Sequence, residues 1–127
     1  MTLAHLVRGL AVTLVLTAAV AVPVALTAPP AAAPGKGNPT LGKAVFTKNC
    51  VVCHKADGSG GMKLTGNPTP NWKLPKTWAD PIRTDAYLKD CITNGKVKSG
   101  MVAWGKSGQL KPADIDNVIA YIKTFKK

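Results

Sequence analysis

Three segments of the chain space their apolar residues at the 3.6-residue period of an amphipathic helix. They run from about residue 39 to 50, from about 84 to 94, and from 112 towards the C-terminus. No segment alternates apolar and polar residues over the length of a strand, and the sequence has no internal repeat. The pattern therefore predicts an all-α fold with three main helices.

Each predicted helix carries a start or a stop signal. Asn38 is a favourable N-cap and is followed by Pro39, a residue suited to the first helical turn. Gly95 directly follows the second helical segment, where glycine commonly ends a helix. Pro112 opens the third segment, and Asp114 in its first turn suits the helix dipole.

Two long loops separate these helices. The segment 55–80 is rich in glycine, proline, asparagine and threonine, has no helical period, and is predicted to be an ordered loop. The second loop, 95–111, carries Met101 and Trp104. So long a loop as 55–80 needs something to wrap around, and a domain this small with few aromatic residues has a thin core. We therefore expect a further group to fill the interior.

The first 33 residues differ from the rest of the chain. An apolar run from Leu10 to Leu26 follows Arg8 and precedes an Ala-Pro-rich stretch, which is the pattern of a secretory signal. The competing interpretation is an uncleaved membrane anchor, since the apolar run 9–28 nearly reaches bilayer length. We divide the chain into this leader (1–33), a flexible lead-in (34–38) and a folded domain (39–127) outside the cytoplasmic membrane.

The most specific motif is Cys50-Val51-Val52-Cys53-His54, because Cys-x-x-Cys-His is the attachment signature of c-type haem. Two intervening residues let both thiols reach the two vinyl groups on one porphyrin edge. The histidine that follows the second thiol then lies under the ring, where it binds iron. Covalent attachment would also supply the missing core.

Three other interpretations of the motif are weaker. A dithiol redox motif belongs in a strand–helix context that the sequence lacks. A zinc site would need Cys91 and His5 as further ligands, and His5 lies in the leader. A structural disulfide would suit an exported protein but would not explain His54 together with the leader and the long loop.

From residue 38 to 127 the chain resembles a small monohaem cytochrome c of the His/Met type, class I. The resemblance is carried by Gly42 and Phe46, by CVVCH and the following ADGSGG turn, by MVAWG at 101–105 and by the last helix. It implies long loops and three helices around one covalently bound haem. It also implies that the first and last helices cross, with Gly42 and Phe46 against Tyr121.

The sixth iron ligand is expected to be a methionine. Met62 follows His54 by so few residues that a reach around the ring is strained, whereas Met101 lies far enough along an irregular loop to cross the haem edge. The family resemblance also favours Met101. The expected cofactor is thus one haem c, bound by Cys50 and Cys53 and with iron ligated by His54 and Met101.

The resemblance adds expectations for supporting residues. The carbonyl of Pro70, or alternatively Pro68, would accept a hydrogen bond from His54. Cys91 is expected to be buried and inert on the stripe of the second helix. Three residues offer N–H groups for the haem propionates, although each is equally well a surface residue: Trp72, Trp78 and Arg83.

Charge bears on the partner. Lysine and arginine number 17 against six acidic residues, all aspartate, for a net charge of +11. A nucleic-acid partner is disfavoured because no recognition motif is present. An acidic patch on a redox protein fits better, since electrostatic steering raises encounter rates. The lysines that flank the ligand segments are Lys55, Lys63, Lys96, Lys98 and Lys106.

With both axial positions filled by protein, the expected function is outer-sphere, one-electron transfer by a monomeric periplasmic carrier, not an enzyme. The alternative is a haem c subunit, or a membrane-tethered domain, of a larger respiratory or redox complex.

Overall fold

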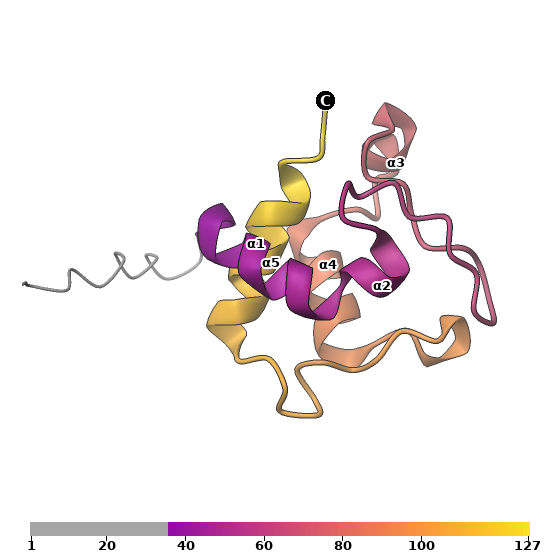
Figure 1. The fold of residues 1–127 in the computed structure, drawn as a ribbon. Coiled ribbons are helices and arrows are strands. Elements are labelled where there is room, and N and C mark those ends of the chain that lie inside the picture. The colour runs from indigo at the N-terminus through magenta and orange to yellow at the C-terminus, as the bar shows by residue number, and fades with distance from the viewer. Residues whose placement is uncertain (1–35) are drawn as a thin grey trace, which may run out of the picture.

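The computed structural model describes residues 36–127, so the predicted leader and the start of the lead-in lie outside the described residues. The described chain is helical, and within it no strand forms and no helix is long and apolar enough to cross a bilayer. The helices are α1 (Pro39–Asn49), α2 (Val51–His54), α3 (Pro75–Ala79), α4 (Asp85–Asn94), η1 (Val97–Ser99) and α5 (Pro112–Lys123) (Figure 1). The all-α prediction is confirmed.

The predicted signals at Asn38 and Gly95 mark helix ends in the structure, and Thr84 provides a further cap that the sequence analysis did not name. The Asn38 side chain accepts hydrogen bonds from the backbone N–H groups of Thr40 and Leu41, at 2.9 and 3.3 Å. The Thr84 hydroxyl caps α4 by accepting from the N–H of Tyr87 at 3.1 Å. Gly95 follows α4 with φ of 73°, a left-handed value that favours glycine.

Two short helices lie in segments predicted to be loops: η1 lies in 95–111 and α3 in 55–80. The segment 55–80, predicted to be a loop throughout, contains α3. Pro75 suits its first turn, and the Thr77 hydroxyl donates to the Asn71 carbonyl at 2.6 Å. The Trp78 indole N–H donates to the Trp72 carbonyl, also at 2.6 Å. Both hydrogen bonds join α3 to residues that precede it. They stabilise a five-residue helix that has no apolar period of its own.

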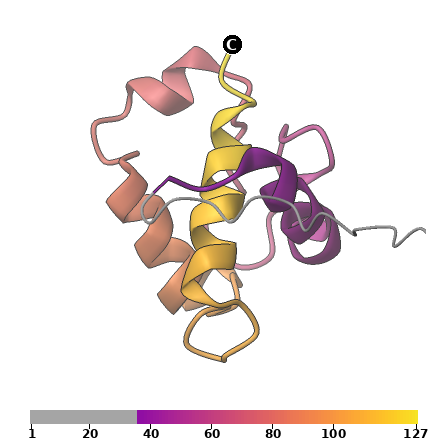
Figure 2. The same cartoon turned by 90° about the vertical axis from the view of Figure 1, so that its left-hand side faces the viewer.

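The close crossing of α1 and α5 forms the core (Figures 1 and 2). A Cβ at Gly42 would collide with the carbonyl oxygen of Asn117 and lie 2.9 Å from the Cβ of Tyr121. The Phe46 and Tyr121 rings meet edge to face at 5.3 Å, and Phe46 and Val118 are almost completely buried. The predicted contact of Gly42 and Phe46 with Tyr121 is therefore present.

A hydrogen bond at the start of α1 also stabilises its contact with α5. Asn117, on α5, is buried, and its side-chain oxygen accepts a hydrogen bond from the backbone N–H of Asn38 at 2.7 Å. The residue that caps α1 is thereby tied to α5, and α1 is held at both its start and its middle.

We expect Gly42→Ala to lower the free energy of unfolding by on the order of 3 kcal/mol, because the added methyl group forces α1 away from α5. Denaturant unfolding of the purified protein measures this. Thr47→Ala, on the exposed face of the same helix, is the control and should change stability little. Equal stability of the two variants would contradict the close helix contact.

Candidate haem site

A largely apolar cavity of about 280 Å³ lies beside the helix core. Cys50, Cys53 and His54, from the end of α1 and from α2, line it, and Met101 lines it from the loop that follows η1. Leu88 and other apolar side chains of α4 complete the wall. The structure thus brings together the four residues predicted to bind haem, whereas Met62 is not among the residues that line this cavity.

Helix α2 turns the motif so that its side chains reach one cavity. The carbonyl of Cys50 accepts hydrogen bonds from the N–H groups of Cys53 and His54, at 3.2 and 2.9 Å. Burial, and then the nearby thiol of Cys53, raises the pKa of Cys50 to about 12. Cys50 is therefore a protonated thiol at neutral pH.

His54 is 8% exposed, and burial lowers its pKa to about 4. At neutral pH the imidazole is therefore uncharged and has a lone pair available for a metal. Its Nδ1 atom is buried and has no hydrogen-bond partner within residues 36–127. The predicted hydrogen bond to the Pro70 or Pro68 carbonyl is wrong for this structure, although both prolines line the cavity.

Met101 is held by a short backbone bridge. Its N–H donates to the Lys96 carbonyl at 3.2 Å, and its own carbonyl accepts from the Lys96 N–H at 3.1 Å. Gly95 makes this bridge possible, because a Cβ there would lie 2.7 Å from the Met101 carbonyl oxygen. Met62 lies in the other loop, where its N–H donates to the Thr69 hydroxyl at 3.1 Å.

Two further side chains in the cavity wall carry buried donors without a partner among the described residues, Trp72 Nε1 and Arg83 Nε. The Asp80 carboxylate stands 3.6 Å from the Arg83 nitrogen, which is too long for a good hydrogen bond. Trp78, the third residue expected to face a propionate, uses its indole N–H on a backbone carbonyl. A carboxylate is a suitable acceptor for these unused donors.

Of the remaining cavity residues, the sequence analysis predicted some and missed others. Cys91 is buried at 8% exposure, as predicted. Leu64 and Asn67 also line the cavity, and sequence reasoning missed both. They lie in a loop that has no period, so no pattern marks them. Their place depends on the contact between the two loops, where the Thr65 hydroxyl donates to the Lys98 carbonyl at 2.7 Å.

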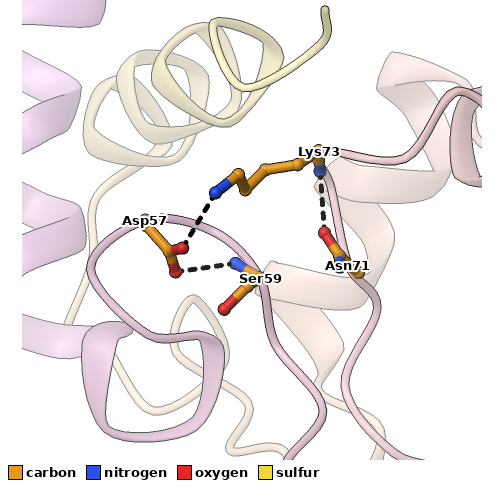
Figure 3. A network of polar contacts seen from close by, with 4 residues as sticks. All are labelled: Asp57, Ser59, Asn71 and Lys73. Carbon is orange, nitrogen blue, oxygen red and sulfur yellow. Dashed lines mark hydrogen bonds and ion pairs between the residues drawn. The ribbon is translucent and has the colours of Figure 1, made fainter.

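A polar clasp closes the loop that follows the Cys-x-x-Cys-His motif (Figure 3). The Asp57 carboxylate accepts from the Ser59 N–H at 3.1 Å and pairs with the Lys73 ammonium at 3.0 Å. The Lys73 N–H donates to the Asn71 side chain at 3.0 Å. Hydrogen bonds from Ser59, and then from Lys73, hold the pKa of Asp57 well below its usual range.

Comparison with known proteins defines the class. The family model described as cytochrome c oxidase, cbb3-type, subunit III, matches residues 37–122. The helical domain and this match define a class I c-type cytochrome. More narrowly, the chain belongs to the family of cbb3-type cytochrome c oxidase subunit III. Its cofactor is therefore one covalently attached haem c, and its chemistry is electron transport.

Curated relatives agree with the family match. The chain is 35% identical over 92 residues to a cbb3-type cytochrome c oxidase subunit CcoP of Azospirillum brasilense, covering 68% of this chain and 30% of that protein. It is 36% identical over 87 residues to CcoP of Azospirillum sp. (strain B510), covering 64% and 28%. It is 35% identical over 88 residues to the subunit FixP of Bradyrhizobium diazoefficiens, covering 66% and 29%.

The chain thus spans under a third of the length of these relatives. No solved structure matches it.

The residues that line the cavity have the chemistry that haem c needs. Two thiols, an uncharged imidazole and a thioether line one cavity with an apolar wall. The buried donors of Trp72 and Arg83 lack partners within the described chain. Buried polar atoms are rarely left unpaired unless a ligand or water satisfies them.

The clasp should make stability depend on acid pH. Because the pKa of Asp57 is depressed in the folded state, its contribution is fully present above the unfolded value of about 3.9 and is lost as pH falls below that value. We therefore expect Asp57→Asn to lower the free energy of unfolding at neutral pH and to have progressively less effect below about pH 4.

Denaturant unfolding of wild type and variant from neutral pH into this acid range measures the difference. Asp90→Asn is the control, since this exposed aspartate accepts a hydrogen bond from Asn94 at 2.8 Å on its own helix and lies outside the clasp. A stability difference between wild type and Asp57→Asn that does not shrink in acid would contradict the assignment.

Proposed function

We propose that the cavity binds the haem, with Cys50 and Cys53 as the attachment sites and His54 and Met101 as the iron ligands. The observation that supports this most is that all four side chains line one cavity although Met101 is far from the others in sequence. The long loops would then wrap around the haem, and α1, α4 and α5 would be the three helices of the cytochrome c fold.

The chemistry of these residues suits haem attachment and iron ligation. Cys50 and Cys53 would hold the haem by thioether bonds, each the net addition of S–H across a vinyl group, so that no oxidant is needed. The uncharged His54 imidazole can ligate without first losing a proton. A Met101 thioether favours reduced iron and raises the reduction potential. The bound haem supplies one-electron redox chemistry, and two protein ligands leave outer-sphere transfer as the route.

We further propose that this domain works with a larger membrane redox complex. The curated relatives described above are oxidase subunits, which favours the subunit interpretation over a freely diffusing carrier. Residues 1–33 would direct export as a signal or hold the domain as an anchor, so that residues 39–127 act in the periplasm.

The surface around the cavity mouth supports a protein partner. Leu64 and Val102 line the cavity and are exposed, and Val97 is 80% exposed; lysines 63, 96 and 98 are their neighbours in sequence. Exposed apolar side chains with lysines next to them in sequence would suit a partner whose docking face offers both apolar and acidic residues.

The ligand assignment is tested by Met101→Ala. We expect this variant to keep its haem, to bind carbon monoxide readily and to have a lower reduction potential, because the thioether is gone and the sixth position is open. Absorption spectra with carbon monoxide and a potentiometric titration measure both effects. Met62→Ala is the matched control and should leave both properties nearly unchanged. The reverse behaviour of the two variants would assign the ligand to Met62.

The docking surface is tested by charge reversal. Lys63→Glu with Lys98→Glu should slow electron transfer to an acidic partner and flatten its dependence on salt, since steering acts within a screening length of about 8 Å at physiological salt. Second-order transfer rates against ionic strength measure this. Lys43→Glu with Lys126→Glu is the control, because these lysines are exposed on α1 and at the C-terminus. Equal losses would mean that net charge alone acts.

A further inference from the structure

Residues 62–69 form a closed loop in the wall of the cavity, and we call this segment the strap. Its two ends are joined, since the Thr69 N–H donates to the Met62 carbonyl at 2.8 Å and the Thr69 hydroxyl accepts from the Met62 N–H at 3.1 Å. Leu64, Asn67 and Thr69 line the cavity. The strap thus has a closed base and a tip formed by its middle residues.

The base of the strap is attached to the Cys-x-x-Cys-His motif. The Thr69 hydroxyl, which accepts from Met62, also donates to the Cys53 carbonyl at 2.8 Å. Beside this bond the chain passes close to itself, because a Cβ at Gly60 would collide with the Pro70 carbonyl oxygen. The base therefore has a fixed position relative to α2.

The tip of the strap contacts the turn that carries Met101, and the two segments lie side by side in Figure 1. The Thr65 hydroxyl donates to the Lys98 carbonyl at 2.7 Å. The backbones also approach closely, since a Cβ at Gly66 would lie 2.9 Å from the Ser99 hydroxyl oxygen and 3.0 Å from the Lys98 carbonyl oxygen. The strap therefore reaches from the motif to the turn of the expected sixth ligand.

The Met101 turn, residues 96–101, is closed on itself by backbone hydrogen bonds. The Lys96 carbonyl accepts from the N–H groups of Ser99 and Met101, at 2.7 and 3.2 Å, and the Lys96 N–H donates to the Met101 carbonyl at 3.1 Å. A turn closed in this way moves as a unit. A hold on the Lys98 carbonyl is therefore also a hold on Met101.

We propose that Thr65 is a positioning residue for Met101, because its hydrogen bond to Lys98 holds the Met101 turn where the thioether can ligate iron. The proposal rests on the proposed role of Met101 as an iron ligand. The strap then connects the two sides of the haem, from the Cys53 carbonyl at its base to the Met101 turn at its tip. Without this connection the turn is held less firmly, and another ligand displaces the thioether more easily.

Imidazole binding to the oxidised, haem-loaded protein tests the proposal, since imidazole competes with the Met101 thioether for the sixth position. Thr65→Val should raise the affinity for imidazole by about fivefold, the usual worth of one hydrogen bond. Thr65→Ser keeps the hydroxyl and should restore the wild-type affinity. Thr124→Val is the matched control, because the Thr124 hydroxyl also donates over 2.7 Å, to the Tyr121 carbonyl after α5. A wild-type affinity in Thr65→Val overturns the proposal.

The same substitution in a Met101→Ala background separates a hold on Met101 from easier access to the iron. With the thioether gone there is nothing to position, so Thr65→Val should no longer change the affinity for imidazole. A fivefold change that persists in this background overturns the proposal and leaves the ligand assignment intact. A Met101→Ala variant that binds imidazole no better than wild type would overturn the ligand assignment itself, and this proposal with it.

Discussion

The close approach of α1 and α5 at Gly42 is the constraint on which the site depends. Helix α1 continues almost without interruption into α2, so the position of α1 on α5 also determines where Cys50, Cys53 and His54 lie. A side chain at Gly42 would meet the backbone of α5, and the resulting shift would pass directly along the helix to the cavity. The packing of α1 on α5 therefore determines both the core and the position of one wall of the haem site.

Local signals made much of this predictable from sequence. The signals at Asn38, Gly95 and Pro112 depend on a few neighbouring residues, so the three longer helices could be placed. The Cys-x-x-Cys-His motif identified the cofactor because its spacing reflects covalent chemistry. The crossing at Gly42 followed from family resemblance and not from any local pattern.

What sequence could not supply depends on contacts between distant segments. Helix α3 forms because Thr77 and Trp78 donate hydrogen bonds to carbonyls in the preceding loop. The spacing of apolar residues does not predict such contacts. The expected hydrogen bond from His54 to the carbonyl of Pro70 or Pro68 is absent among the described residues, and the stacking of Trp72 on the same imidazole had no sequence signal. Both concern the exact path of a loop, which tertiary packing decides.

The distribution of charge on the domain indicates what kind of partner would suit it. The aspartates form ion pairs with lysines or an arginine within the domain, except Asp114, which caps the start of α5. The acidic side chains are therefore engaged locally, and most lysines are left with no opposite charge of their own. A partner that supplies carboxylates complements this surface, and its attraction must weaken with salt.

The central claim is that a covalently bound haem occupies the cavity between the motif and Met101. Mass spectrometry of the purified protein under denaturing conditions tests it most directly, because only a covalent group survives unfolding. The account predicts the mass of the polypeptide plus one haem, with fragments that carry the haem on the peptide containing Cys50 and Cys53. An unmodified polypeptide, or one whose only change is a disulfide between these two cysteines, would contradict it.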